Sequence, residues 1–237
     1  MLSKTSIAVL LTFWFHCAKA QQPIGSWNIL NAKINLDHHW SFFTEAQIRS
    51  LSFYNEFHYH ELKIGANFSI DKNFSIAVGI GDYNTYSPGG NFKSPRVNDE
   101  LRTWLQIGMS QYLERIKFDH RYRVEQRWTS GGYRNRFRYR LNAVLPINHK
   151  KLDKKTFYAT AFDELFFTDK APYFERNRFF VGAGYVFTSY FTLQAGILHQ
   201  LDYKINEETN RSYFQLSLLY EVAFKKNRKE NMPSSED

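Results

Sequence analysis

The sequence predicts an all-β protein, an antiparallel up-and-down transmembrane β-barrel of about 10–12 strands. Three observations predict this fold. Charged and apolar residues alternate with a period of two along most of the chain, a secretory signal precedes them, and aromatic residues make up 18% of the sequence. Successive side chains of a strand point to opposite faces, so this pattern gives each strand one greasy and one charged face. Outer-membrane barrels place lipid against the first face, enclose the second, and carry aromatic girdles.

Residues 1–20 have the features of a signal peptide. Lys4 supplies a positive start, residues 7–15 form an apolar core, and Ala18-Lys19-Ala20 offers a small-x-small cleavage site. The apolar core is too short to span a bilayer as a helix. Cys17 follows Phe15-His16, which does not suit a lipidation site, and it is the single cysteine. We therefore expect a mature chain without thiol chemistry. Because Lys4 and Lys19 leave with the signal, the net charge falls from +8 to +6.

Alternating segments predict the barrel over residues 21–224. Most are ten to fourteen residues long, and a tilted strand needs about 9–11 to cross the hydrocarbon. Single-chain bacterial barrels have an even number of strands, so we expect ten or twelve. The polar residues 225–237 are predicted to be a disordered, periplasmic tail. Eleven strand candidates cover residues 27–36, 40–50, 57–70, 74–86, 99–110, 115–128, 134–145, 156–167, 176–187, 191–203 and 211–224.

The connections are predicted to alternate between short turns at the periplasmic end and longer loops outside. Residues 37–39, 71–73 and 188–190 fit short turns, and the longer loops are expected at residues 87–98, 168–175 and 204–210. One segment conflicts with this scheme. Residues 146–155 are long and basic but fall where a periplasmic turn should be. The last strand closes with Tyr220-x-Val222-x-Phe224, similar to the terminal strand that the barrel-assembly machinery recognises.

The charged faces of residues 117–128 and 134–145 should meet in one hairpin. A turn at residues 129–133 would set Arg127 near Arg134, and would bring further arginines opposite one another. Like charges directly opposite destabilise a strand pair, so carboxylates from other strands, or water and mobile anions, must offset them. Glycines 79, 81, 182 and 184 fall on the inner face, where they would leave room for long arginine side chains or mark a bend in the wall. The inner carboxylates that could serve are Glu45, Glu61, Glu100, Glu164 and Glu221.

These side chains define a predicted charge network in the lumen. It consists of Arg121, Arg123, Glu125, Arg127, Arg134, Arg136, Arg138, Arg140, Glu45, Arg49, Glu100, Arg102 and Glu164.

A series of short motifs runs along the chain in a fixed order. The motifs are Gly25-Ser26-Trp27, Glu45-x-x-x-Arg49, Glu100-x-Arg102, Arg123-x-Glu125-x-x-Trp128, Arg136-x-Arg138-Tyr139-Arg140-Leu141, Glu164 and Gly182-x-Gly184-Tyr185. In this order they resemble the DUF2490 family of predicted bacterial outer-membrane proteins without an assigned activity. The resemblance implies the bacterial outer membrane as location and carries over no catalytic residues.

Two functions remain open for such a barrel. Arg–Glu pairs could brace a closed or narrow lumen, or the arginines could line a small anion-preferring pore. The alternative is an outer-membrane enzyme of esterase or phospholipase type, although no recognisable hydrolase motif occurs. His58-x-His60 lacks a third metal ligand, and no cofactor is expected. The expected partners are outer-membrane lipid, the barrel-assembly machinery and small anionic solutes, and export argues against nucleic acid.

Overall fold

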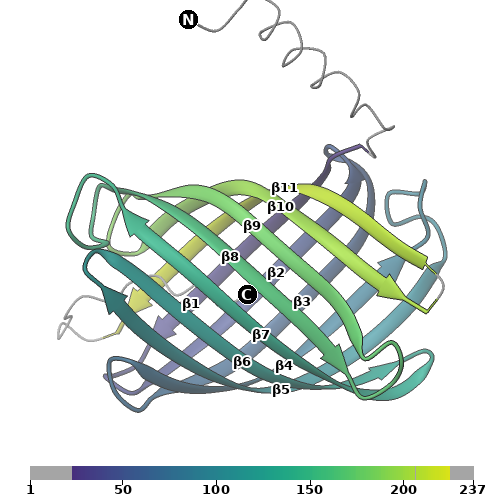
Figure 1. Cartoon of the computed structure of the whole chain (residues 1–237), viewed down its shortest axis with the longest axis horizontal. Helices are drawn as coiled ribbons and strands as arrows, with labels where there is room; N and C mark the ends of the chain where they lie inside the picture. Colours follow the sequence, from purple (N-terminus) through teal and green to yellow (C-terminus); the bar gives the residue numbers. More distant parts are fainter. Residues whose placement is uncertain (1–22, 206, 225–237) are drawn as a thin grey trace, which may run out of the picture.

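The computed structural model describes residues 23–205 and 207–224, and nearly all of these belong to eleven strands (Figure 1). The predicted signal peptide and tail lie outside the described residues. Each predicted strand is present, with ends that shift by a few residues. The strands are β1 (Gly25–Asn35), β2 (Trp40–Ser52), β3 (Asn55–Ser69), β4 (Phe74–Tyr86), β5 (Arg96–Leu113), β6 (Ile116–Thr129), β7 (Gly132–Pro146), β8 (Thr156–Thr168), β9 (Phe174–Val186), β10 (Phe191–Lys204) and β11 (Glu207–Ala223).

The strands close into a barrel in sequence order, and one seam differs from the rest. Every consecutive pair is antiparallel, but β1 pairs with β11 in parallel, from Gly25 opposite Tyr213 to Asn35 opposite Ala223. The expectation of an even number of strands was therefore wrong for the described chain. Hairpin-linked strands alternate in direction, so the first and last of eleven run the same way and can only close in parallel. A parallel ladder is only slightly less stable than an antiparallel one, so closing the barrel in this way costs little stability.

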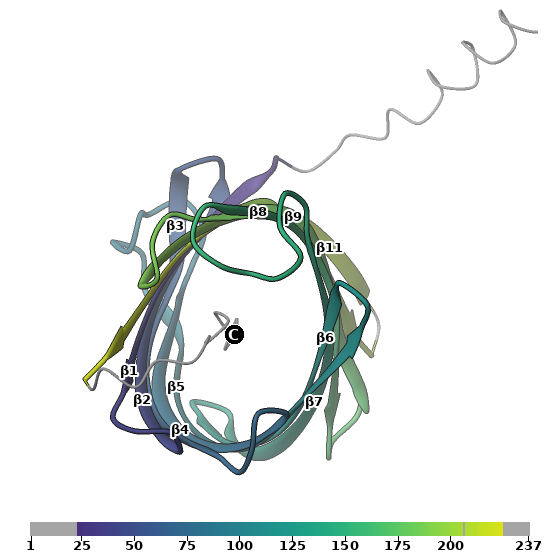
Figure 2. The same cartoon turned by 90° about the vertical axis from the view of Figure 1, so that its left-hand side faces the viewer.

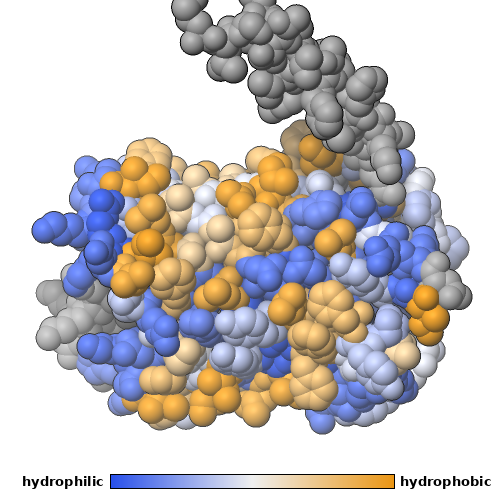
Figure 3. Space-filling model, viewed as in Figure 1, coloured by the Kyte–Doolittle hydropathy of each residue, from blue (hydrophilic) through white to orange (hydrophobic). Residues whose placement is uncertain are grey.

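The wall has two chemically distinct faces, as the alternation predicts. Leu62, Ile64 and Val78 are 53–56% exposed on the outside, whereas Glu125 is 0% exposed inside. Figure 3 shows hydrophobic residues spread over one side of the barrel wall, interrupted by hydrophilic ones. Some polar side chains on the outer face form hydrogen bonds with one another. The side-chain amide of Asn177, for example, donates to the Asp163 carboxylate at 2.7 Å. The described residues contain no helix that is long and apolar enough to cross a membrane.

Aromatic rings share the interior with the charges. Trp104, an exception to the expected polar inner face, is 4% exposed and lies directly over Gly79. Tyr158 covers Gly184 in the same way. The inner glycines therefore mainly make room for rings rather than for arginines, because any Cβ at these two positions would overlap an aromatic side chain.

The connections at the two ends of the barrel differ less in length than predicted. We call the end that carries residues 36–39, 70–73, 114–115, 147–155 and 187–190 the vestibule end, and the opposite end the far end. The loop expected at residues 204–210 is absent, because β10 runs to Lys204 and β11 starts at Glu207.

The basic segment that conflicted with the short-turn scheme folds over the vestibule end. Leu152 is 9% exposed and packs with Val144, Tyr158 and Val186, and the amide of Lys155 donates to the Val186 carbonyl at 2.6 Å. Figure 2 looks into this end and shows a segment curling across part of the opening. The length of this segment therefore serves to narrow the mouth.

Candidate functional site

The β6–β7 hairpin has the predicted register and supplies most of the lumen charge. A two-residue turn at Ser130 and Gly131 joins the strands, and the Thr129 hydroxyl donates to the Gly132 carbonyl at 2.9 Å. Gly132 adopts a φ of 104°, which glycine tolerates without strain. The resulting cross-strand pairs are Arg121 with Arg140, Arg123 with Arg138, Glu125 with Arg136 and Arg127 with Arg134.

Glu125 is the centre of this hairpin's charges. Its carboxylate accepts from Arg136 and Arg138, each with an N–O distance of 2.6 Å, and lies 3.8 Å from Arg123. All four side chains are buried. Bidentate and shared guanidinium–carboxylate contacts fix geometry as well as charge, so Glu125 holds three arginines in place across the hairpin.

Glu164 on β8 extends the network. It accepts from Arg121 at 2.5 Å and Arg138 at 2.7 Å, and Arg178 lies 3.9 Å away. Arg140 is its cross-strand neighbour. Arg138 therefore links the two carboxylates, and the chain of contacts runs through β6, β7, β8 and β9.

Glu100 and Glu175 complete the network toward the far end. Glu100 accepts from both Arg102 and Arg127. Glu175 lies 3.2 Å from Arg127 and Arg134 and 3.6 Å from Arg136. Arg134 is the most exposed member, with 34% of its side chain accessible.

Sequence reasoning placed Glu175 in a loop and missed its role. A β-bulge between Phe166 and Phe167 shifts the β8–β9 register, so Phe167 pairs with Phe174 and Phe166 with Arg176. The extra residue breaks the period-two rule locally. No alternation signal could therefore have assigned Glu175 to the inner face.

A second, smaller group occupies the β1–β3 side. Lys63 pairs with Glu45 and lies 2.9 Å from Glu61. Arg49 lies 3.2 Å from Glu61, with its guanidinium carbon 3.4 Å from the Trp27 ring centroid. Here cations and carboxylates are equal in number, and cation–π contact adds to the attraction.

In the larger network on β5–β9, positive charges outnumber negative ones. Eight arginines lie within ion-pair distance of only four glutamates, Glu100, Glu125, Glu164 and Glu175. The arginines are Arg102, Arg121, Arg123, Arg127, Arg134, Arg136, Arg138 and Arg178. The lumen along β5–β9 therefore carries a positive excess.

Two cavities lie on either side of this network. One of about 1400 Å³, which we call the vestibule, opens at the vestibule end, and one of about 230 Å³ lies among the charged and aromatic side chains of the interior. Arg140 lines both and marks the boundary between them. The interior is thus wide at the vestibule end and narrow among the arginines.

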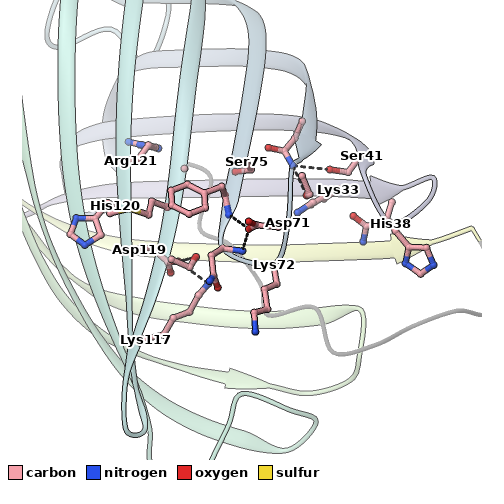
Figure 4. Close-up of a pocket in the computed structure, with 18 of the residues that line it drawn as sticks. Lys33, His38, Ser41, Asp71, Lys72, Ser75, Lys117, Asp119, His120 and Arg121 are labelled. Carbon is pink, nitrogen blue, oxygen red and sulfur yellow. Dashed lines mark hydrogen bonds and ion pairs between the residues drawn. The ribbon is translucent and has the colours of Figure 1, made fainter.

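The vestibule is basic. Figure 4 shows Lys33, Lys72, Lys117 and Arg121 around it. Two of its acidic side chains have local partners: Lys117 lies 2.8 Å from Asp119, and Asp37 accepts the amides of His39 and Trp40, each at 2.7 Å. The hydrogen bond from the Trp40 amide, followed by that from His39, holds the pKa of Asp37 below its ordinary value, so it stays ionised at neutral pH.

Other chemistry finds less support in the described residues. They contain no cluster of three or more histidine, cysteine or acidic side chains placed to hold a metal ion. His199 Nδ1 lies 3.0 Å from the Ser212 hydroxyl oxygen, but neither residue lines the two cavities described above.

Comparison with known proteins gives one match. The model of the family described as "Protein of unknown function (DUF2490)" matches residues 24–211, which is most of the chain. No curated protein and no solved structure matches.

Proposed function

Because the chain belongs to the DUF2490 family, whose description assigns no activity, we propose from its own geometry that it is an outer-membrane β-barrel with a narrow, ion-pair-braced lumen that prefers small anions. The observation that carries the proposal is the enclosed group of eight arginines and four glutamates. It lies inside a wall whose outer face is largely apolar.

The outer face supports the membrane assignment. Monomeric soluble proteins rarely expose large continuous apolar patches, yet here the exposed large hydrophobic residues occur on every strand. The strands, at 11–18 residues, are long enough for a tilted crossing. Bulk lipid would cover this face, and the signal predicted at residues 1–20 would deliver the chain to it.

The interior supports a narrow lumen with an anion preference. The ion pairs connect both neighbouring strands and strands two or three positions apart, so they stiffen the wall and fill the space that a wide pore would need. The surplus of guanidinium groups leaves a positive potential where the two cavities meet, and rings of arginine or lysine favour anions in pores. Large solutes are excluded by the same side chains.

Planar-bilayer recording of the purified, folded protein tests the proposal. We expect a small conductance whose reversal potential in a KCl gradient shows chloride preference. Changing both Arg136 and Arg138 to Ser should enlarge the conductance and reduce the preference, because it removes braces and positive charge together. Changing the exposed Lys170 to Ser is the control.

A folded, inserted protein that stays silent at all voltages would contradict the pore and leave a closed barrel. Cation preference would contradict the electrostatic reasoning. The proposal also makes the protein non-enzymatic, so turnover of a lipid ester by the purified barrel would count against it.

A further inference from the structure

The floor of the vestibule combines positive charge with open space. Gln106 and Gly108 of β5, Arg121 of β6 and Arg140 of β7 line it at neighbouring register positions. Gly108 lies directly opposite Arg121 and contributes no side chain. A ligand that enters from the vestibule end therefore meets two adjacent guanidinium groups.

Arg121 shares its carboxylate with other arginines. Glu164 is the only glutamate that the described structure places within ion-pair distance of Arg121, and it also accepts from Arg138 and lies near Arg178. Arg121 and Arg140 are directly opposite each other, and like charges in that position repel. Both side chains are almost fully buried, at 5% and 4% exposed, and an excess of buried positive charge is costly.

The hydrogen-bond donors of Arg121 also indicate a shortage of anionic acceptors. Arg121 is 5% exposed and uses its Nη2 for Glu164, while its buried Nε and Nη1 have no acceptor. Arg123 Nη1, two residues along the strand, also lacks one. Leaving a buried charged donor unsatisfied costs more than leaving a neutral one, so the site is incomplete as it stands.

We propose that the vestibule floor binds a phosphate-type oxyanion, with Arg121 and Arg140 as its principal contacts. A multiply charged anion supplies the missing charge and several acceptor oxygens at once, and arginine suits phosphate because its donors form a planar fork. The vestibule, at about 1400 Å³, exceeds the 300–1,000 Å³ typical of small-molecule sites. The phosphate can therefore be free or part of a small organic molecule. This inference rests on the proposed function in that it names the solute class.

Isothermal titration calorimetry of the full barrel in detergent micelles tests the site without requiring conduction. We titrate inorganic phosphate and, in a second arm, glycerol phosphate, each against a constant chloride background. We expect saturable binding to one site. Tighter binding of glycerol phosphate would identify an organic phosphate as the preferred form, and equal binding would identify the free ion.

Arg121→Gln should weaken phosphate binding about tenfold, which is the usual scale for losing charged hydrogen bonds. Arg176→Gln is the matched control, because Arg176 is a lumen arginine that pairs with Asp202 and does not line the vestibule. If Arg121→Gln fails to fold, Arg121→Lys keeps the charge and removes the Nε and Nη1 donors, and it should also weaken binding.

Absence of saturable binding to the unaltered protein would overturn the inference, and so would equal weakening by Arg121→Gln and Arg176→Gln. Conductance without phosphate binding would refute this site alone. Phosphate binding without conductance would refute the pore and leave the site standing.

Discussion

Glu125→Gln is the sharpest test of the braced lumen. The substitution keeps the size of the side chain and removes its charge. Glu125 is completely buried and accepts from Arg136 and Arg138 at 2.6 Å. After the change, Arg138 keeps Glu164 as a partner, whereas Arg136 keeps only Glu175 at 3.6 Å.

The expected loss follows from that asymmetry. Removing one partner of a buried ion pair costs about 3–5 kcal/mol, because the remaining charge stays buried without compensation. Arg123 keeps its hydrogen bonds to the side-chain oxygen of Gln106, and Arg136 keeps only its long contact with Glu175, so we expect the free energy of unfolding to fall by about 3 kcal/mol, at the lower end of that range.

Equilibrium unfolding in guanidinium, followed by tryptophan fluorescence in detergent micelles, measures this loss. Glu175→Gln is the matched control. Glu175 also contacts three arginines, but its side chain is 14% exposed and its ion pairs are longer, at 3.2–3.6 Å. Solvent reaches these pairs more readily, so we expect a smaller loss for Glu175→Gln than for Glu125→Gln. Equal, small losses in the two variants would mean that water screens the whole lumen, and the bracing argument would be refuted.

Two further variants test the wall. Gly79→Val places a side chain in the volume of the Trp104 ring and should lower the free energy of unfolding by about 1–3 kcal/mol. Gly131→Ala, at a turn where a Cβ would meet only the Thr129 hydroxyl oxygen at an ordinary 3.7 Å, is its control, and equal melting temperatures would contradict the packing argument. Leu62→Arg on the outer face should cost about 2–4 kcal/mol when the barrel unfolds from lipid vesicles. Tyr173→Arg, in an exposed connection, should cost little, and a neutral Leu62→Arg would argue that water covers the wall.

Much of the fold could be predicted because strand alternation is local. The hairpin register of Arg121 with Arg140 follows from two alternating segments and one short turn, and the structure confirms it. Trp104 broke the pattern without breaking the strand, since a ring over Gly79 fits the inner face as well as a charge does.

The strand number, the position of Glu175 and the ion-pair partners could not be predicted from local alternation. Each strand's pattern is independent of how the first and last strands meet, so alternation alone could not settle the strand number. The bulge beside Phe166 moved Glu175 inward against its phase. The partners of the lumen arginines likewise come from strands distant in sequence, as when Arg121 reaches Glu164, and only the closed wall brings them together.

The parallel seam between β1 and β11 has a consequence for where the chain's ends emerge. Gly25 enters the wall at one rim and Ala223 leaves it at the other. In a bilayer, an epitope tag ahead of Gly25 and another beyond Ala223 would face different compartments, so antibody staining of intact cells would reveal exactly one of them. Insertion would then have to carry a whole terminus across the hydrocarbon, a topological demand that is absent from barrels with an even number of strands, whose two termini lie on the same side.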